Sequence, residues 1–368
     1  MPATPSPATP SPAVPPVAAD PAAAVVPTGR GRRTLLLGIE TSCDETAAAV
    51  VARHDDGSFE VLSSVVSSQI DLHARFGGVV PEVASRAHLE RLDPVVAEAL
   101  AVAGIRGRDL DAVAATAGPG LVGALLVGVS AAKALALVWD VPFVAVNHLE
   151  AHLFAPLLQE PDVAFPLLVL LVSGGHTLLL GMDAPGAYRV LGRTVDDAAG
   201  EAFDKVARYL GLGYPGGPAV DRLATSGDAT AIAFPRSMLH DGLALSFSGL
   251  KTSVVNHVRR NPDVATADVA ASFQEAVVDV LVHKARRAAA GIGAVGMSLA
   301  GGVAANRRLR ARWVKAAAAG GLRAHLPSPA YCTDNAAMVA AAGLWRLAEH
   351  GPSALGCGVD PNLSLADD

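Results

Sequence analysis

The chain has 368 residues, of which 51% are hydrophobic and only 4% aromatic, a balance typical of a soluble α/β protein with one large domain or two lobes. Its formal net charge of −6 excludes a general attraction to nucleic acid or anionic membranes, so a polyanion would need a local basic patch or a second subunit. The three cysteines show no Cys-x-x-Cys spacing, which indicates neither a disulfide framework nor a cysteine zinc site and favours a reducing cytoplasm.

Residues 1–33 consist almost entirely of Pro, Ala, Thr, Ser and Val and end in the basic residues Arg30, Arg32 and Arg33. This composition cannot form a hydrophobic core, so we expect a disordered extension. A signal peptide would carry its positive charges before the apolar run, whereas here they follow it.

Two hairpins with polar tips are predicted far apart in the chain. In the first, the apolar run from Thr34 to Thr41 leads into the polar turn Glu40–Thr46, and Ala47–Ala52 forms the second strand. The second hairpin repeats this order with Leu167–Val172, Ser173–Thr177 and Leu178–Met182. Either tip alone could be an ordinary polar turn. Their repetition suggests an internal duplication and two similar lobes.

Between the hairpins we expect an amphipathic helix, Val83–Ala103, and a strand, Ala112–Thr116, followed by a tight turn. The next run, Leu121 to Trp139, is long enough to span a membrane, but Lys133 lies within it. A central lysine costs about 2.5–3.5 kcal/mol on insertion scales. We therefore predict a buried helix between two strands and no transmembrane segment.

Two histidines follow the next predicted strand, Val141–Val146. If Asn147 caps a helix, His148 and His152 project from one helical face and can bind a single metal ion. A zincin peptidase has its glutamate directly after the first histidine, whereas this chain has leucine there and Glu150 one residue later. Taken alone, the pair could be ordinary surface or core histidines.

The second half of the chain contains further polar groups. Asp196–Leu210 reads as a charged helix whose acidic and basic residues could simply form a solvated face. A rigid turn, Gly213–Pro218, precedes a helix that carries Asp221. A set of basic residues could face a polyanion or merely balance nearby acids; it comprises Lys251, Arg259, Arg260, Lys284, Arg286 and Arg287.

A predicted strand, Val295–Leu299, enters a glycine pair and then the helix Arg307–Ala319. Strand, glycine pair and helix N-terminus form a geometry that accepts a phosphate or a nucleotide, although a lone glycine pair is weak support. Near the end of the chain, Asp334 precedes the helix Ala336–His350, so it could be only a helix-start residue.

Eight motifs occur in the order found in one family: Gly38–Thr46, Asn147–His152, Leu171–Thr177, Asp197–Lys205, Tyr214–Pro218, Phe247–Thr252, Gly301–Asn306 and Thr333–Ala336. Through them the chain resembles the tRNA adenosine threonylcarbamoyltransferase (TsaD) family, once labelled glycoprotease, from about Leu36 to about Asn362. The resemblance implies an α/β fold of the actin, Hsp70 and sugar-kinase type, with two duplicated lobes and a nucleotide-binding cleft between them. We place the first lobe at residues 34–165 and the second at 166–368, with a C-terminal segment that returns to the first.

The resemblance also implies site residues. A metal, with Fe(II) favoured and Zn(II) possible, is expected on His148, His152 and Asp334. The adenylate phosphate and acyl part are expected on Leu171, Val172, Ser173, Gly174 and Gly175, and the nucleoside on Asp204, Gly217, Asp221 and Asn306. The sequence assigns no general base; Glu45 and His176 are two options.

The implied reaction transfers a threonylcarbamoyl group from threonylcarbamoyl-adenylate to the adenosine beside the anticodon, in tRNAs that read codons starting with A, and releases AMP. The implied partners are tRNA, a TsaB-like paralogue and a TsaE-like ATPase, with no membrane. Three alternatives are a metallopeptidase, a small-molecule kinase of the same superfamily and a non-catalytic scaffold subunit. The missing zincin glutamate argues against the first, and the three metal ligands have no purpose in the other two.

Overall fold

A computed structural model describes residues 33–365 of the chain. The predicted disordered extension, residues 1–33, lies outside this range except for Arg33.

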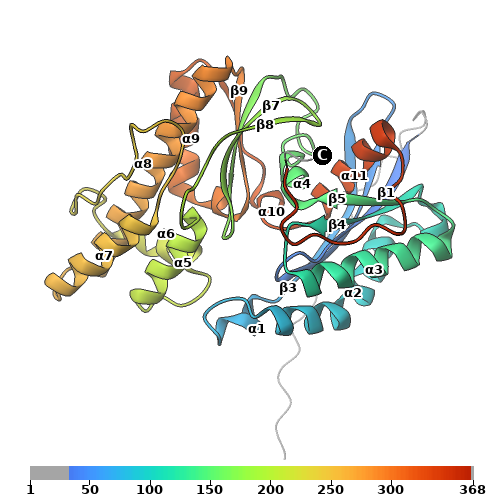
Figure 1. Cartoon of the computed structure of the whole chain (residues 1–368), viewed down its shortest axis with the longest axis horizontal. Coiled ribbons are helices and arrows are strands. Elements are labelled where there is room, and N and C mark those ends of the chain that lie inside the picture. The colour runs from blue at the N-terminus through green and yellow to red at the C-terminus, as the bar shows by residue number, and fades with distance from the viewer. Residues whose placement is uncertain (1–32, 366–368) are drawn as a thin grey trace, which may run out of the picture. The chain divides into compact units, whose positions relative to one another are not determined.

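Within residues 33–365 the strands form two five-stranded sheets of the same topology (Figure 1). The first has the order β3-β2-β1-β4-β5 and the second the order β8-β7-β6-β9-β10. In each, three antiparallel strands form a meander whose first strand pairs in parallel with the fourth. The first sheet comprises β1 (Thr34–Glu40), β2 (Glu45–Arg53), β3 (Phe59–Ser68), β4 (Ala112–Gly118) and β5 (Phe143–Asn147). The second comprises β6 (Leu167–Val172), β7 (Thr177–Ala184), β8 (Ala187–Arg193), β9 (Gly296–Ala300) and β10 (Arg323–His325). The matching order confirms the duplication predicted from the two hairpins.

Helices cover both faces of the sheets. In the first half they are α1 (Ile70–Ala74), α2 (Pro81–Ala103), the 3-10 helix η1 (Gly107–Asp109), α3 (Val122–Trp139) and α4 (His148–Leu153). The second half contains α5 (Ala199–Tyr209), α6 (Gly216–Leu223), η2 (Ala224–Ser226), α7 (Ser248–Arg260), α8 (Thr266–Ile292), η3 (Gly302–Ala305), α9 (Arg307–Ala319), α10 (Pro329–Cys332) and α11 (Ala336–His350).

Strands β1, β2 and β4 of the first sheet are buried on both faces because nearly all their positions are apolar rather than only alternate ones. Helices α2 and α3 pack on one face, and α11 packs on the other. Gly38 of β1 faces α11 so closely that a Cβ atom there would overlap the carbonyl oxygen of Ala336. The second sheet has α5 to α9 on one face and α4 on the other.

The segment after α11 runs back along the first sheet. Ser353 donates its N–H to Phe143 of β5, and Asp360 donates its N–H to Ala117 of β4. The Asn147 side chain, at the end of β5, donates to the carbonyl of Ser364 at 3.0 Å. The lobe boundary between residues 165 and 166 stays a prediction.

Helix α3 differs from its prediction. It lies between β4 and β5 in the chain as expected, but only 33% of its apolar window is buried. By length and composition alone it is the one helix of residues 33–365 that could cross a membrane. Every fourth residue of its outer face is exposed, namely Val122, Leu126, Ser130, Ala134 and Val138. The predicted burial holds for only one side of the helix, because packing on one sheet face leaves the other side uncovered.

Helix α5 begins at Ala199, three residues later than predicted. Asp196 and Asp197, which were predicted to lie in this helix, precede it. The Asp196 carboxylate accepts a hydrogen bond from the N–H of Phe247, and Asp197 binds Lys251. These long-range partners hold the two residues outside the helix.

Candidate metal centre and substrate site

Helix α4 carries the histidine pair and is fixed at its start and along its length. The Asn147 Oδ1 atom accepts hydrogen bonds from the N–H groups of Leu149 and Glu150, which confirms the predicted N-cap. Leu149 and Leu153 pack against the second sheet, and Ala151 packs in the core between the first sheet and α11. The short helix is therefore held between the two halves of the chain.

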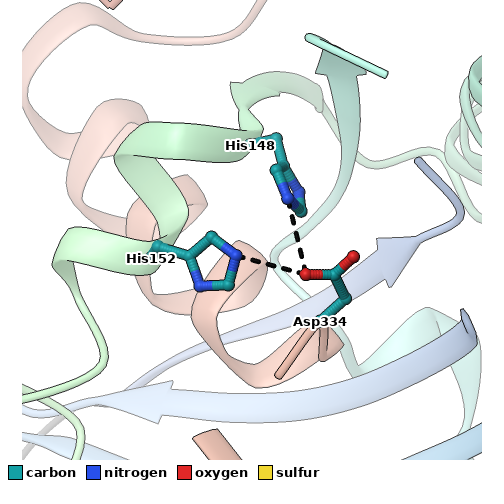
Figure 2. A group of neighbouring side chains, drawn as sticks. All are labelled: His148, His152 and Asp334. Atoms are coloured by element: carbon teal, nitrogen blue, oxygen red, sulfur yellow. Dashed lines mark hydrogen bonds and ion pairs between the residues drawn. The ribbon is translucent and has the colours of Figure 1, made fainter. Parts of the chain in front are cut away.

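The three predicted metal ligands converge on one point. The Nε2 atoms of His148 and His152 lie 3.5 Å and 3.2 Å from Oδ1 of Asp334. The ligand atoms all lie within 4.8 Å of one another, and Figure 2 shows both rings directed at the carboxylate. Asn335, not Asp334, caps α11 through the N–H of Met338, so Asp334 is not needed as a helix-start residue.

The electrostatics of this group suit a cation. Burial opposes ionisation of Asp334, but the charge of His148 and a hydrogen bond from His152 outweigh it and lower the pKa of Asp334 to about 2. Burial also opposes protonation of His148, but the carboxylates of Glu40 and Asp334 outweigh it and raise the pKa of His148 to about 9. Two imidazoles and one carboxylate are a donor set for Zn(II) or Fe(II) that leaves coordination positions open.

Glu40 forms a hydrogen bond with the Nδ1 atom of His148, a role that the sequence did not reveal. Its side chain is fully buried, and its Oε2 atom accepts hydrogen bonds from His148 Nδ1 at 3.0 Å and from Thr116 Oγ1 at 2.6 Å. Its Oε1 atom accepts from the N–H of Ser42 at 2.5 Å. An ionised carboxylate only accepts, so it holds a proton on Nδ1, and a metal on Nε2 would displace the second proton that the raised pKa of His148 keeps there. The feature of the sequence that could have indicated this role is a single carboxylate at the end of an otherwise apolar strand.

Glu40→Gln is expected to weaken metal binding by about 10-fold to 100-fold, because its amide NH₂ must face at least one of the donors that the carboxylate accepts from. Zn²⁺ affinity measured against a chromophoric chelator checks this. Glu160→Gln is the matched control, since Glu160 binds His325 Nδ1 at the same 3.0 Å, outside the metal ligand set. Equal affinity in the Glu40 variant and the unchanged protein would contradict the role.

The tips of both predicted hairpins bring a titratable side chain near this site. Burial raises the pKa of Glu45 to about 10, and Asp334 and Asp44 add to the effect. Burial lowers the pKa of His176 to about 4, and the nearby His148 and His152 add to it. Without a cation both groups are therefore uncharged at neutral pH, with His176 unprotonated and Glu45 protonated. The identity of the general base stays a prediction.

The segment expected to bind phosphate, Leu171–Gly175, comprises the last two residues of β6 and the start of a hydrogen-bonded turn. Ser173 donates its N–H to the carbonyl of His176 at 2.8 Å, and Ser173 Oγ accepts from the His176 N–H. The backbone at Gly174 and Gly175 is open, since a Cβ atom on either would meet nothing within 4 Å. Gly200, in the first turn of α5, donates its N–H to the Ser173 carbonyl at 3.1 Å.

Of the residues expected to hold the nucleoside, Asp204 and Gly217 lie together where α5 packs on α6. The Asp204 Oδ1 atom accepts from the N–H of Gly216 at 2.7 Å. Burial raises the pKa of Asp204 above its usual value despite this bond. The backbone of Gly217 is unobstructed.

Asp221 and Asn306 are already engaged with other residues of the chain. Asp221 Oδ2 accepts from Arg307 Nε at 2.7 Å. Asn306 caps α9 through the N–H of Leu309 and donates to Gln274 Oε1 at 2.7 Å. Their binding roles stay predictions, and Arg307 and Gln274 are neighbours that the sequence did not reveal.

Comparison with known proteins assigns the family. A family profile described as tRNA N6-adenosine threonylcarbamoyltransferase, TsaD, matches residues 60–341. The chain belongs to this family. The family member from Symbiobacterium thermophilum is 56% identical over 317 residues, which cover 85% of this chain and 92% of the relative. The member from Clostridium perfringens strain SM101 is 48% identical over 340 residues, 91% of this chain and 99% of the relative. The resemblance inferred from the motifs is confirmed.

A solved structure with a similar fold is HypF from T. kodakarensis. It superimposes with a TM-score of 0.59 at 18% identity, covering 88% of this chain and 48% of that one. At this identity the similarity shows the fold alone. Together with the two matching sheets, it confirms the α/β fold of the actin, Hsp70 and sugar-kinase type.

Proposed function

We propose that the chain transfers an L-threonylcarbamoyl group from threonylcarbamoyl-adenylate to the exocyclic amine of the adenosine next to the anticodon of tRNA, and releases AMP. The substrates are tRNAs that read codons starting with A. The observation that supports this most is the convergence of His148, His152 and Asp334 in a chain of this family. Cytoplasmic location follows from the same proposal.

In this reaction the amine nitrogen bonds to the carbamoyl carbon, and the bond from that carbon to the adenylate oxygen breaks. His148, His152 and Asp334 would hold a divalent ion, Fe(II) by preference or Zn(II), which when bound supplies a Lewis acid. The open backbone at Gly174 and Gly175 offers N–H groups to the anionic phosphate or the developing oxyanion. Glu45 and His176 stay the two proposed options for accepting the amine proton.

The metallopeptidase alternative has no observation in its favour. Glu150, the only carboxylate of the α4 motif, is 3% exposed and binds Arg346 of α11 at 2.6 Å. Its carboxylate is therefore committed to an ion pair rather than to activating a water molecule beside the two histidines.

The transfer assay tests the proposal directly. Purified protein, its partner subunits, tRNA and threonylcarbamoyl-adenylate should yield threonylcarbamoyladenosine and AMP in equal amounts. A complete set of components that forms no modified nucleoside, with metal present, would overturn the proposed function.

We further propose that the chain acts with a TsaB-like paralogue and a TsaE-like ATPase, as its acidic charge gives it little general affinity for tRNA. The uncharged outer ridge of α3 supports the pairing with the paralogue. Val122, Leu126 and Val138 on this ridge are 53%, 50% and 79% exposed, and Leu137 beside it is 65% exposed. An uncharged, mostly apolar ridge of residues four apart fits a helix of a subunit that shares this fold.

Leu126→Glu or Val138→Glu is expected to weaken pairing with the paralogue at least about tenfold, because each would bury an unpaired carboxylate in the interface. Sedimentation of the two purified subunits measures this. Val314→Glu on α9, where the valine is 45% exposed, is the matched control and should leave pairing unchanged. If all three variants pair normally, the ridge is not the interface.

A further inference from the structure

Helix α7 departs from the acidic character of the rest of the chain. Its 13 residues, Ser248–Arg260, contain no Asp or Glu, whereas the chain as a whole has a net charge of −6. Lys251, Arg259 and Arg260 carry its positive charges. Such a local reversal of charge is what a polyanion needs to bind an acidic protein.

Interactions with Asp196 and Asp197 hold the N-terminus of α7 near the proposed acyl site. The Asp196 carboxylate accepts from the N–H of Phe247 at 2.8 Å and from Ser248 Oγ at 3.0 Å. Asp197 binds Lys251 Nζ at 3.1 Å. Three residues further on, Gly200 donates to Ser173 of the β6 tip. One short stretch of chain therefore joins the substrate tip to the start of α7.

The Lys251 ammonium forms an ion pair with Asp197, so Lys251 anchors the start of α7 and is not available to contact tRNA. Arg259 and Arg260, at the C-terminal end of α7, are the charged residues left for such a contact. Arg259 and Arg260 are exposed, and neither forms an ion pair with any residue between 33 and 365. The acidic side chain closest in sequence is Asp263, which is also exposed.

The outer face of α7 forms a continuous polar surface along its length. Leu250 and Val254 point inward and are buried. A shallow groove of about 520 Å³ follows the other side, and its lining includes Thr252, Asn256 and Arg260 but no acidic residue. A helix of 13 residues is about 20 Å long. In Figure 1, α7 extends to the lower left, away from the second sheet.

We propose that this outer face of α7 binds the sugar-phosphate backbone of the substrate tRNA, with Arg259 and Arg260 on phosphates and Asn256 as a neutral donor. The proposal rests on the proposed function, since it places the tRNA whose adenosine enters the acyl site. Amide and guanidinium donors without acids are the usual partners of phosphate and sugar oxygens. Contacts of this kind position an RNA without reading its sequence.

The test measures tRNA affinity of the full chain, alone and with its partner subunits, as a function of salt. Arg260→Ala should reduce the slope of log affinity against log salt by about 1, and Arg259→Ala/Arg260→Ala by about 2. Arg286→Ala is the matched control: Arg286 is exposed on α8, also without an ion pair in the described chain, and its loss should leave the slope unchanged. All these side chains are exposed, so thermal unfolding should not change.

Two results would overturn the proposal. One is an equal loss of slope in the Arg286 variant, which would indicate a general charge effect. The other is an unchanged slope in the double variant, including the case in which that variant instead loses a partner subunit. Because the binding measurement uses no adenylate, its failure is distinguishable from failure of the proposed transfer reaction.

Discussion

His148→Ala, His152→Ala and Asp334→Ala are each expected to lose the bound metal and to reduce threonylcarbamoyl transfer by more than about 100-fold. Each change leaves two ligands, too few to hold a divalent ion against water. His152 is only 1% exposed, but α4 keeps its cap on Asn147 and its leucine contacts, so the variants should remain folded. Elemental analysis of the purified variants, beside the transfer assay, measures both effects.

Glu150→Gln is the control for these variants, because Glu150 lies on the same helix but binds Arg346. It should keep both metal and activity, with a lower unfolding temperature from the weakened buried ion pair. Full metal occupancy in the Asp334 variant would remove Asp334 from the site. Loss of activity in the Glu150 variant alone would revive the peptidase hypothesis.

Gly301→Ala is expected to destabilise the protein by about 2–4 kcal/mol, combining a strained backbone with overpacking. Gly301 has φ of +85°, a conformation that L side chains rarely adopt. A Cβ atom there would lie 2.5 Å from the Val172 carbonyl oxygen, directly before the Ser173 tip. Relief of this overlap must separate β9 from the end of β6, so adenylate binding should weaken as well.

Gly302→Ala provides the neighbouring control. Its φ is ordinary, and a Cβ atom would meet nothing within 4 Å. Its free energy of unfolding, measured with urea, should therefore stay within about 1 kcal/mol of the unchanged protein. Similar stability of both variants would show that the approach of Gly301 to Val172 is not required for folding.

The parts of the fold that were predicted well from the sequence are determined by interactions between residues close together in the chain. The helices Arg307–Ala319 and Ala336–His350 were predicted to the residue, because Asn306 and Asn335 supply caps that mark where each begins. The two hairpins were confirmed because apolar runs and polar tips alternate within a few residues. Such signals depend only on neighbours in the chain.

The parts that were missed depend on partners far away in sequence. Asp196 resembles a helical residue until its bond to Phe247, 51 positions later, is known. The apolar composition of α3 does not reveal which side of the helix packs on the sheet and which side is left for another subunit. At the candidate metal site the resemblance implied the three ligands, but the hydrogen bond of His148 with Glu40, 108 positions earlier, required the folded structure.

The proposed metal site combines residues that lie far apart in the sequence. Asn147 both caps α4 and donates to the carbonyl of Ser364, and Asp334, the third proposed metal ligand, comes 182 positions after His152. A nascent chain that has not reached residue 334 presents only the two histidines. If His148, His152 and Asp334 hold the proposed ion, a fragment that ends before residue 334 carries only two of the three ligands and should bind the ion more weakly.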